Sequence, residues 1–404
     1  MAQQRVDAVF MRGGTSRGIF FQRAWLPAAR EDWDPIFLGA LGSPDPYGRQ
    51  LDGLGGGVSS LSKVVVVEPS SRADADVEYT FGQVAVREAA VAYRTNCGNL
   101  TSAVGPFAVD EGLVTPSVDS NGEAAVRLHN VNTGKRIVAR FPLDGASAAV
   151  EGEFELLGVG GSGAPIRLEF QDPGGAVTGE LLPGGAPAEL LAVPGLGDLR
   201  VSIVDATTAV VAVQAADLGL SGSELPDAIE ADAGLLARLE AVRGAAALRL
   251  GLSPSVEEAI ACSPQSPLIA IVSAPQPATT LAGEAVAPEA VDLTARVMSM
   301  GQAHRALPLT AAMCLAVAAR IEGSVVHEQA RPGDAAADLR LGNPSGVLPV
   351  AASVRREGGD RWIADDVVVY RTARRLMEGR VLVPVSRLAA PEATTTAAAT
   401  GAAP

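Results

Sequence analysis

The sequence has few of the residues that build disulfide scaffolds and metal centres. Three cysteines (Cys97, Cys262 and Cys314) and three histidines occur among its 404 residues. A sparse, odd-numbered set of cysteines excludes a disulfide framework and indicates a reducing compartment. Because HExxH, paired CxxC and EF-hand patterns are also missing from the sequence, we expect no metal centre.

Positive charge and long apolar runs are scarce as well. Acidic residues outnumber basic ones by 46 to 32, which gives a formal net charge of −14. An anionic chain of this kind is a poor candidate for a nucleic-acid or anionic-membrane surface. No segment approaches the roughly 20 apolar residues of a membrane span, and the N-terminal sequence lacks the apolar stretch of a secretory signal. We therefore expect a cytoplasmic protein without nucleic-acid or membrane partners.

Apolar residues, glycine and proline are abundant instead. Hydrophobic residues make up 48% of the chain, which excludes a disordered protein. The 44 glycines and 27 prolines follow no three-residue period, so they indicate many turns and exclude a collagen helix. Short apolar runs between the turns predict strands at Val6–Phe10, Gly18–Phe21, Val64–Glu68, Val84–Val91, Ala125–Leu128, Arg136–Phe141, Leu199–Val204, Val210–Gln214, Leu268–Ser273, Val350–Val354 and Asp366–Tyr370. Helical patterns lie at about 99–111, at 225–248 with a break near 233–234, near Glu257 and at 309–321.

An internal repeat links two of these helical patterns. Thr101–Val114 and Thr310–Val325 each contain a threonine, small and apolar residues, an acidic residue, a glycine and the expected start of a strand. A weaker similarity pairs Leu54–Val67 with Leu341–Val354, and chance among Ala- and Val-rich segments is the alternative for both. The repeat predicts two similar domains, each a sheet curled around one apolar helix. We place them at residues 1–190 and 191–388, followed by a disordered low-complexity tail at 389–404.

Cys97 is the first candidate for chemistry, because it stands in Asn-Cys-Gly-Asn directly before an apolar helical run. A helix N-terminus offers unpaired N–H groups and a partial positive charge, which stabilise a thiolate and bind a carboxylate. We therefore predict a catalytic Cys97, with Gly98, Asn99 and Ser102 as substrate-binding residues. The alternative is a capping turn with a bystander cysteine.

Lys63 is the second candidate and ends the Gly- and Ser-rich segment Gly53–Lys63. The GK[ST] ending of a P-loop is missing from this segment. A lysine at the edge of an apolar strand can act as an acid or a base, and the hydroxyls of Ser59 and Ser60 are candidate donors to substrate. The alternative is a solvated strand end.

Two further turns carry candidate donors. Thr15, Ser16 and Arg17 belong to the segment MRGGTSRG, which is rich in N–H and O–H groups and could bind an anion, although a plain hairpin turn is the alternative. Ser345 lies in the turn GNPSG, and His304 precedes the second apolar helix, so both are candidate binding residues. The GxGxxG match at Gly158–Gly163 precedes a strand and not a helix, which argues against a dinucleotide site.

Taken in order, MRGGTSRGIFF, DGLGGGVSSLSK, NCGNLTSAVGPFAVDEGLV, AHRALPLTAA and GNPSGVLPV resemble the 2-methylaconitate isomerase family. That family also holds 4-oxalomesaconate tautomerases and 3-methylitaconate isomerases. The resemblance runs from about Val6 to Pro384 and is weakest between Asp144 and Gly197. It implies the α/β diaminopimelate epimerase-like fold: two similar domains, each a curled mixed sheet around a central helix, with the active site in the cleft between them. In that fold the last strand of the chain returns to the first domain.

The resemblance also implies proton transfer without a cofactor, next to an activated C=C–carboxylate system. Lys63 and Cys97 correspond to the lysine and cysteine of the family motifs. Similar epimerases use a cysteine at each helix start, but the repeat aligns Cys97 with Ala306, which disfavours a two-thiol mechanism and leaves Lys63 as the second acid or base. At position 17 many members carry lysine where this sequence has Arg17, which keeps the positive charge.

The expected function is a cofactor-independent isomerase of small unsaturated di- or tricarboxylates, with 2-methylaconitate isomerase favoured. A 4-oxalomesaconate tautomerase, a 3-methylitaconate isomerase, an amino-acid racemase or epimerase, and a non-catalytic carboxylate-binding protein are the alternatives. Which of Lys63 and Cys97 is the base stays open. The expected partner is a small polycarboxylate substrate, and a homodimer is the expected assembly because dimers are common.

Overall fold

The computed structural model describes residues 3–93, 96–120, 122–262, 266–334, 337–359 and 361–388. The predicted tail at 389–404 lies outside the described residues. Contacts divide the chain into two compact units. Unit 1 comprises Met1–Gly134, Leu143–Val150 and Thr372–Pro404, and unit 2 comprises Lys135–Pro142 and Glu151–Arg371.

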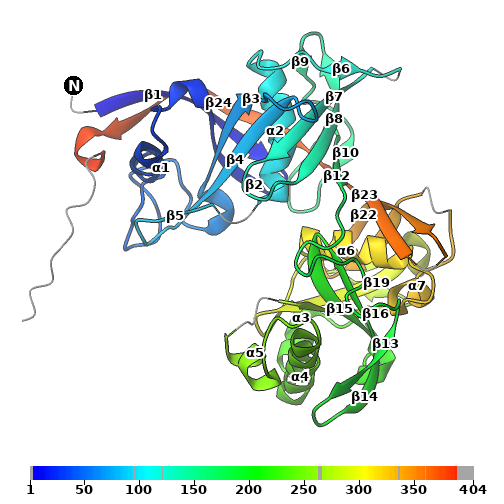
Figure 1. Cartoon of the computed structure of the whole chain (residues 1–404). Helices are drawn as coiled ribbons and strands as arrows, with labels where there is room; N and C mark the ends of the chain where they lie inside the picture. The colour runs from blue at the N-terminus through cyan, green and yellow to red at the C-terminus, as the bar shows by residue number, and fades with distance from the viewer. Residues whose placement is uncertain are drawn as a thin grey trace, which may run out of the picture. The chain divides into compact units, whose positions relative to one another are not determined.

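This division differs from the predicted boundary between residues 190 and 191. Residues 151–190 group with unit 2, because β12 (Ile166–Gln171) pairs along its length with β23 (Arg361–Arg371). The last strand, β24 (Ala373–Pro384), pairs with β1 (Gln3–Gly13) and so returns to unit 1 (Figure 1), as the resemblance implied. Strand pairing between distant segments therefore decides which unit a segment belongs to, and composition carries no signal of it.

Unit 1 contains a mixed sheet in the order β24–β1–β2–β3–β4–β7. Pairing is antiparallel for β1–β2 and β3–β4, and parallel for β2–β3 and β4–β7. The further strands of this unit are β2 (Ser16–Gln22), β3 (Lys63–Pro69), β4 (Val77–Val84), β5 (Val91–Ala92), β6 (Ser117–Val118), β7 (Glu123–Asn130) and β9 (Ser147–Ala148).

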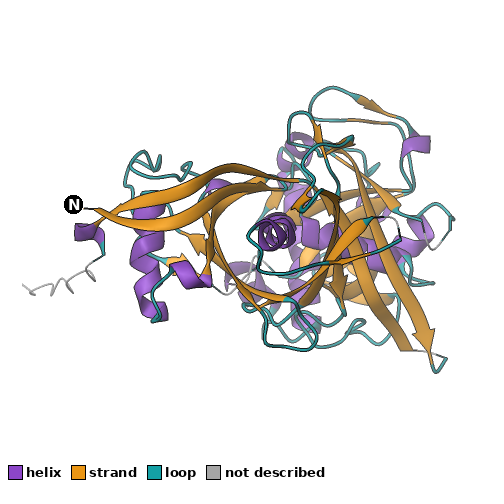
Figure 2. Ribbon diagram, turned by 90° about the horizontal axis from the view of Figure 1, so that it is seen from above, coloured by secondary structure: helices purple, strands orange, loops and turns teal. Residues whose placement is uncertain are grey.

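Helix α2 (Gly98–Asp110) is the central helix of unit 1, and Figure 2 shows it end-on within the curve of the strands. Every residue from Leu100 to Val109 is buried, as expected of a helix that is covered on all sides. Close packing depends on glycine: a Cβ at Gly13 would lie 2.7 Å from the Asn99 carbonyl oxygen. The predicted helix at 99–111 is confirmed.

The other face of the strands packs against α1 (Trp33–Leu41), a helix that the sequence analysis missed. Pro35 lies in the first turn of this helix, where proline is tolerated. The buried side chains Phe37 of α1 and Phe21 of β2 stack with their ring centroids 5.4 Å apart.

Unit 2 repeats the pairing scheme of unit 1 in a longer sheet, ordered β13–β14–β15–β16–β19–β21–β22–β23–β12–β8. Antiparallel β14–β15, parallel β15–β16, antiparallel β16–β19 and parallel β19–β21 follow the same succession as β1, β2, β3, β4 and β7. This repetition confirms two similar mixed-sheet units. The remaining strands are β8 (Arg136–Asp144), β10 (Phe154–Glu155), β11 (Ser162–Gly163), β13 (Glu189–Val193), β14 (Gly197–Ala206), β15 (Thr208–Gln214), β16 (Leu268–Ser273), β17 (Ala278–Thr279), β18 (Ala285–Val286), β19 (Leu293–Ser299), β20 (Gln302–Ala303), β21 (Leu339–Asn343) and β22 (Gly346–Glu357).

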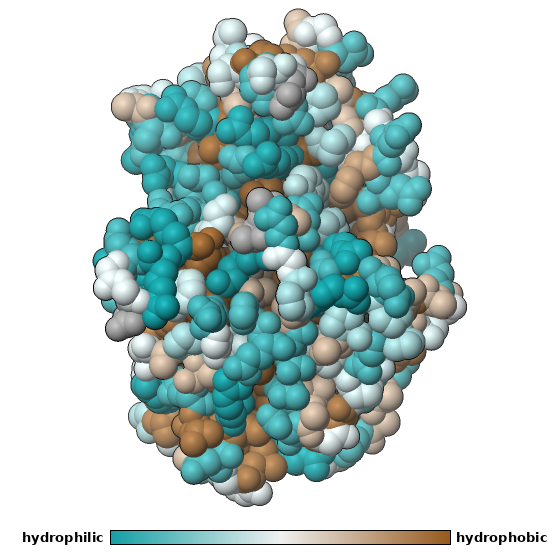
Figure 3. All heavy atoms as spheres, turned by 90° about the vertical axis from the view of Figure 1, so that its right-hand side faces the viewer, coloured by the Kyte–Doolittle hydropathy of each residue, from teal (hydrophilic) through white to brown (hydrophobic). Residues whose placement is uncertain are grey.

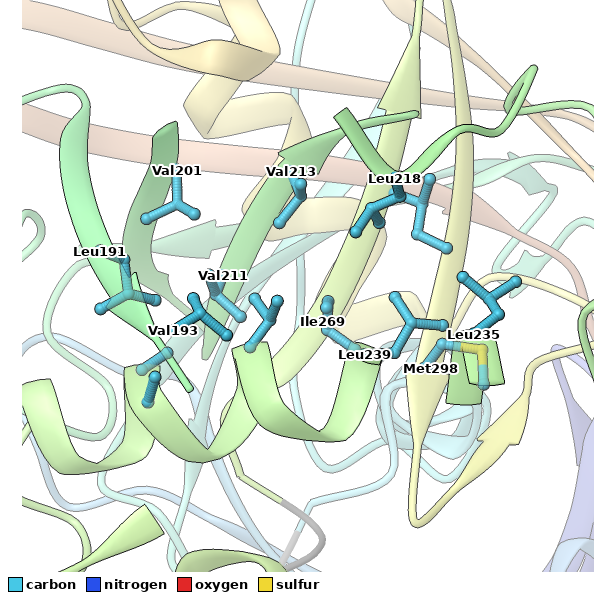
Figure 4. Packing of buried hydrophobic residues seen from close by; sticks show 14 of the residues in the cluster. Leu191, Val193, Val201, Val211, Val213, Leu218, Leu235, Leu239, Ile269 and Met298 are labelled. Carbon is cyan, nitrogen blue, oxygen red and sulfur yellow. The ribbon is translucent and has the colours of Figure 1, made fainter. Parts of the chain in front are cut away.

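The central helix of unit 2 is α6 (Leu309–Ala319), which packs on β14, β15 and β22. Helix α4 (Ala233–Arg249) packs on this sheet through Leu235 and Leu239, which belong to one hydrophobic cluster with Val213 and Ile269 (Figure 4). The predicted break before α4 is present, because Asp232 accepts a hydrogen bond from Leu235 N at 2.9 Å and caps the helix. The other helices are α3 (Pro226–Glu230), α5 (Val256–Cys262) and α7 (Val325–Gln329).

Three local predictions were wrong. The strand expected at Val84–Val91 is interrupted, because Ala85 N bonds to Ala90 O and closes a turn between β4 and β5. The strand expected after Gly323 is helix α7, which Ser324 caps by accepting from His327 N at 3.0 Å. The similarity of Leu54–Val67 to Leu341–Val354 is not structural, since the second segment is the β21–β22 hairpin and the first is a loop that leads into β3.

The protein surface in Figure 3 is mainly hydrophilic, with small separate groups of hydrophobic residues. Scattered apolar side chains are ordinary on a folded protein. None of the helices in the described part of the chain has both the length and the apolar character that a membrane crossing requires.

Candidate active site

Three of the predicted site residues meet in unit 1 beside the N-terminus of α2. Lys63 Nζ lies 3.1 Å from Cys97 Sγ and 3.3 Å from Ser16 Oγ, and donates to both. Ser16 Oγ and Cys97 Sγ are 4.0 Å apart. The parallel pairing of β2 and β3 explains the contact between Ser16 and Lys63, because these residues begin neighbouring strands at the same end of the sheet.

The Lys63–Cys97 pair is shielded from water, with the two residues 9% and 8% exposed. The Phe81 ring centroid lies 5.7 Å from Lys63 Nζ. Among the described residues, no carboxylate lies within ion-pair distance of Lys63, so the Cys97 sulfur is the acidic group in contact with the amine. The pair can hold ammonium with thiolate or amine with thiol, and these forms differ only in the position of one proton.

Four more predicted residues belong to the β1–β2 turn and to the start of α2, beside this cluster. Asn99 Nδ2 donates to Thr15 Oγ1 at 3.1 Å and joins the β1–β2 turn to the first turn of α2. Gly98 begins the helix. Ser102 is fully buried and its hydroxyl donates to Asn99 O at 2.7 Å, so this hydroxyl already has a partner within the helix.

Other predicted residues of unit 1 lie apart from Lys63 and Cys97. Ser59 and Ser60 lie on a 3₁₀ turn before β3, where Ser59 is exposed and Ser60 half-buried, and within the described residues no hydrogen bond joins their hydroxyls to the pair. Arg17 follows Ser16 in β2, so its side chain points to the opposite face of the sheet. There its guanidinium carbon lies 5.5 Å from the Phe10 ring centroid, and its buried Nε has no hydrogen-bond partner among the described residues.

The two remaining predicted residues belong to unit 2. Ser345 Oγ donates to Arg305 O at 2.7 Å, so the GNPSG turn and the segment holding His304 lie together, as expected for two parts of one site. Burial lowers the pKa of His304 and favours its neutral form. That these residues act with Lys63 and Cys97 stays a prediction.

The other cysteine among the described side chains is structural. Cys314 is fully buried in α6 and donates to Val204 O at 3.3 Å. Burial raises the pKa of this thiol to about 12, which keeps it protonated and unreactive at neutral pH. The prediction that Cys314 belongs to the core is confirmed.

The sequence analysis missed a group of polar side chains behind Cys97. The side-chain oxygen of Asn96 lies 2.8 Å from Cys97 N, 3.0 Å from Asn130 Nδ2 and 3.2 Å from the Tyr79 hydroxyl. Thr101 Oγ1 lies 3.0 Å from both the Tyr79 hydroxyl and Cys97 O. Asn96 and Thr101 belong to the cysteine motif, but no local signal marks Tyr79 and Asn130, because they come from distant strands.

The part of the chain that the structure describes holds no group of three or more His, Cys, Asp or Glu side chains suited to a metal ion.

Comparison with known proteins identifies the family. The family model described as "PrpF protein" matches residues 3–384. The chain belongs to this family. A relative from Shewanella oneidensis named 2-methyl-aconitate isomerase is 41% identical over 390 residues, covering 95% of this chain and 98% of the relative.

A further relative and a solved structure are also named as isomerases. A 3-methylitaconate isomerase from Eubacterium barkeri is 39% identical over 387 residues, covering 96% of this chain and 99% of the relative. The crystal structure of a methylitaconate-delta-isomerase matches with a TM-score of 0.90 and 38% identity, covering 96% of this chain and 98% of that chain. The family resemblance and the α/β fold predicted from the motifs are confirmed, and the protein is an isomerase.

Proposed function

We propose that the protein is a cofactor-independent isomerase of small unsaturated di- or tricarboxylates, and that Lys63 and Cys97 move an allylic proton. The single observation that carries the proposal is the 3.1 Å contact between Lys63 Nζ and Cys97 Sγ in a site with little exposure to water. A proton shift inside one molecule is redox-neutral, so an acid–base pair is sufficient chemistry for it.

The reaction begins when the basic member of the pair removes a proton from the carbon next to the double bond. The electron pair of the broken C–H bond spreads into a dienolate, whose negative charge moves onto a carboxylate oxygen. Return of the proton to the far carbon shifts the double bond. Return to the original carbon, after rotation about the bond that has lost its double-bond character, gives the cis–trans isomer.

The surroundings of the pair suit the charge that develops. The first turn of α2 presents N–H groups without intrahelical partners and the positive end of the helix dipole. Ser16 and Thr15 add hydroxyl donors beside it. Donors aimed at a developing oxyanion lower the barrier because they need no reorganisation during the reaction. A net charge of −14 is compatible with an anionic substrate, since the attraction is supplied locally.

Of the possible substrates, 2-methylaconitate is our first choice. The relative named 2-methyl-aconitate isomerase is 41% identical to this chain, and the relative named 3-methylitaconate isomerase is 39% identical. Both acids carry the required allylic C–H next to a carboxylate-conjugated double bond. A racemase of amino acids is disfavoured, because racemisation needs a base on each face of the carbon, whereas Lys63 and Cys97 contact each other.

The test is proton exchange with solvent. The protein is incubated in D₂O with 2-methylaconitate, methylitaconate, the keto form of oxalomesaconate, proline or diaminopimelate, and deuterium entry is followed by NMR. We expect exchange and isomerisation with one of the unsaturated acids. Lys63→Ala should lower the rate by about 10²–10⁴-fold, the range of a positioned acid or base.

Lys135→Ala is the matched control, because Lys135 is the second lysine of the chain, is half-buried, and donates to Asp172 O at 3.2 Å and not to the Lys63–Cys97 pair. It should keep the wild-type rate. Exchange of proline or diaminopimelate alone would establish a racemase. If no acid exchanges, and Lys63→Ala and Cys97→Ser bind ligand like the wild type, the protein is a carboxylate-binding protein and the proposal is wrong.

A further inference from the structure

Cys97 is the N-cap residue of α2. A preferred N-cap side chain accepts a hydrogen bond from an N–H of the first turn, as Asp232 does at the start of α4. Cys97 has an extended backbone (φ −115°, ψ 96°) and makes no such bond, because its sulfur contacts Lys63 instead. The N–H groups of the first turn are thereby left for a ligand, and other groups must hold the backbone of Cys97 in place.

Two pairs of side chains hold that backbone, one at its N–H and one at its carbonyl. At the N–H, Asn96 Oδ1 accepts from Cys97 N at 2.8 Å and from Asn130 Nδ2 at 3.0 Å. These two donors fill both lone pairs of the amide oxygen. The orientation of the Asn130 side-chain amide is fixed, because its oxygen accepts hydrogen bonds from Thr133 N at 2.9 Å and from Thr133 Oγ1 at 3.0 Å.

At the carbonyl, two hydroxyls form the second group. The Tyr79 hydroxyl lies 3.0 Å from Thr101 Oγ1 and 3.2 Å from Asn96 Oδ1, and the Thr101 hydroxyl donates to Cys97 O at 3.0 Å. Burial raises the pKa of Tyr79 to about 12, so its phenol stays a donor at neutral pH.

Both groups of hydrogen bonds begin at residues of the sheet. Tyr79 of β4 and Asn130 of β7 are register partners in a parallel pair, so their side chains share one face. They are 1% and 0% exposed. In so buried a site, a polar group without a hydrogen-bond partner destabilises the fold, and a network in which every group is hydrogen-bonded is rigid.

We infer that Asn96, Asn130, Tyr79 and Thr101 are positioning residues, which transmit the rigidity of the β4–β7 pair to Cys97 and keep its thiol in contact with Lys63. Their effect on catalysis rests on the proposed function. Their effect on the Cys97 backbone does not, and the two are measured separately.

The variants are Tyr79→Phe and Thr101→Val, which each remove one hydroxyl and little volume, and Thr101→Ser, which restores the hydroxyl. Tyr93→Phe is the matched control, since the Tyr93 hydroxyl of the same unit donates to Asp34 and not to this network. Amide hydrogen exchange of the peptide spanning residues 96–101 reports the backbone, and kcat and KM report catalysis.

In Tyr79→Phe and Thr101→Val we expect exchange at 96–101 to become about fivefold faster, the equivalent of one net hydrogen bond. We expect kcat to fall by about 10–100-fold, the cost of a misplacement near 1 Å, with KM unchanged. Thr101→Ser and Tyr93→Phe should stay close to the wild type in both measurements. In a Cys97→Ala background, Tyr79→Phe should have no further effect on kcat.

Three results overturn the inference: equal exchange at 96–101 in Tyr79→Phe and Tyr93→Phe, faster exchange with unchanged kcat, or a fall in kcat that persists in the Cys97→Ala background. Failure of the proposed function looks different. In that case either no acid exchanges with the wild type, or Lys63→Ala and Cys97→Ala turn over substrate like the wild type, whatever the hydrogen exchange at residues 96–101 shows.

Discussion

Gly13→Ala is a one-methyl test of how the sheet places α2. An ideal Cβ at Gly13 would lie 2.7 Å from Asn99 O, 3.0 Å from Leu100 Cα and 3.2 Å from Ala103 Cβ. The contact with Asn99 O is about 0.7 Å inside the 3.4 Å at which ordinary contact begins. Two of the three atoms are backbone, so relief requires β1 or the start of α2 to move.

The magnitude follows from that displacement. Overpacking a dense core costs typically about 1–3 kcal/mol of unfolding free energy. A shift of about 0.7 Å in the turn that carries Cys97, Gly98 and Asn99 approaches the 1 Å misplacement that costs about 10²-fold in rate. We therefore expect a variant that remains folded in unit 1 but has lost most of its isomerase activity.

The assay combines deuterium exchange of the substrate with urea unfolding followed by tryptophan fluorescence. Gly160→Ala is the control, because a Cβ at Gly160 meets no atom within 4 Å. It should be neutral or slightly stabilising, since alanine restricts the unfolded chain. If Gly13→Ala matches Gly160→Ala in both activity and urea midpoint, close packing of the sheet on α2 does not position the site.

Two further predictions concern stability. Gln50 is fully buried, donates to Ser43 Oγ at 2.8 Å and Ser62 Oγ at 2.7 Å, and accepts from Gly57 N at 3.0 Å, so it ties the glycine-rich loop to the residue before Lys63. Gln50→Leu should lower the free energy of unfolding by about 1–3 kcal/mol for each buried group left unpaired. Gln302→Leu, at an exposed position, is the control and should leave the free energy of unfolding unchanged. Equal urea midpoints for the two variants would contradict the prediction. Burial lowers the pKa of His304 below 6.5 in the folded protein, so the unfolded chain binds more protons at this residue. The contribution of neutral His304 to the free energy of unfolding is therefore complete above pH 6.5 and is lost as the pH falls through the folded pKa. His304→Gln should remove that part of the pH dependence of stability, and an unchanged slope below pH 6.5 would refute the assignment.

Much of the local structure could be predicted from the sequence. The central helices α2 and α6 are continuous apolar runs, and the Asn-Cys-Gly-Asn motif directly precedes one of them. Such patterns predict elements because the residues involved are neighbours along the chain. Lys63 and Cys97 were identified as candidates by residue type, setting and family resemblance, all of which are properties of the sequence.

Only the tertiary structure brought those candidates together. Ser16, Lys63 and Cys97 come from separate segments, and their contact depends on β2 pairing with β3 while α2 packs on Gly13. The return of β24 to β1 and the hydrogen bonds from Tyr79 and Asn130 likewise depend on pairing between distant strands. No residue pattern encodes such pairings locally, because their free energy comes from contacts that exist only once the sheet has formed. The sequence by itself determined the chemistry that the chain carries and the helix at which it lies, and the sheet decided which groups touch.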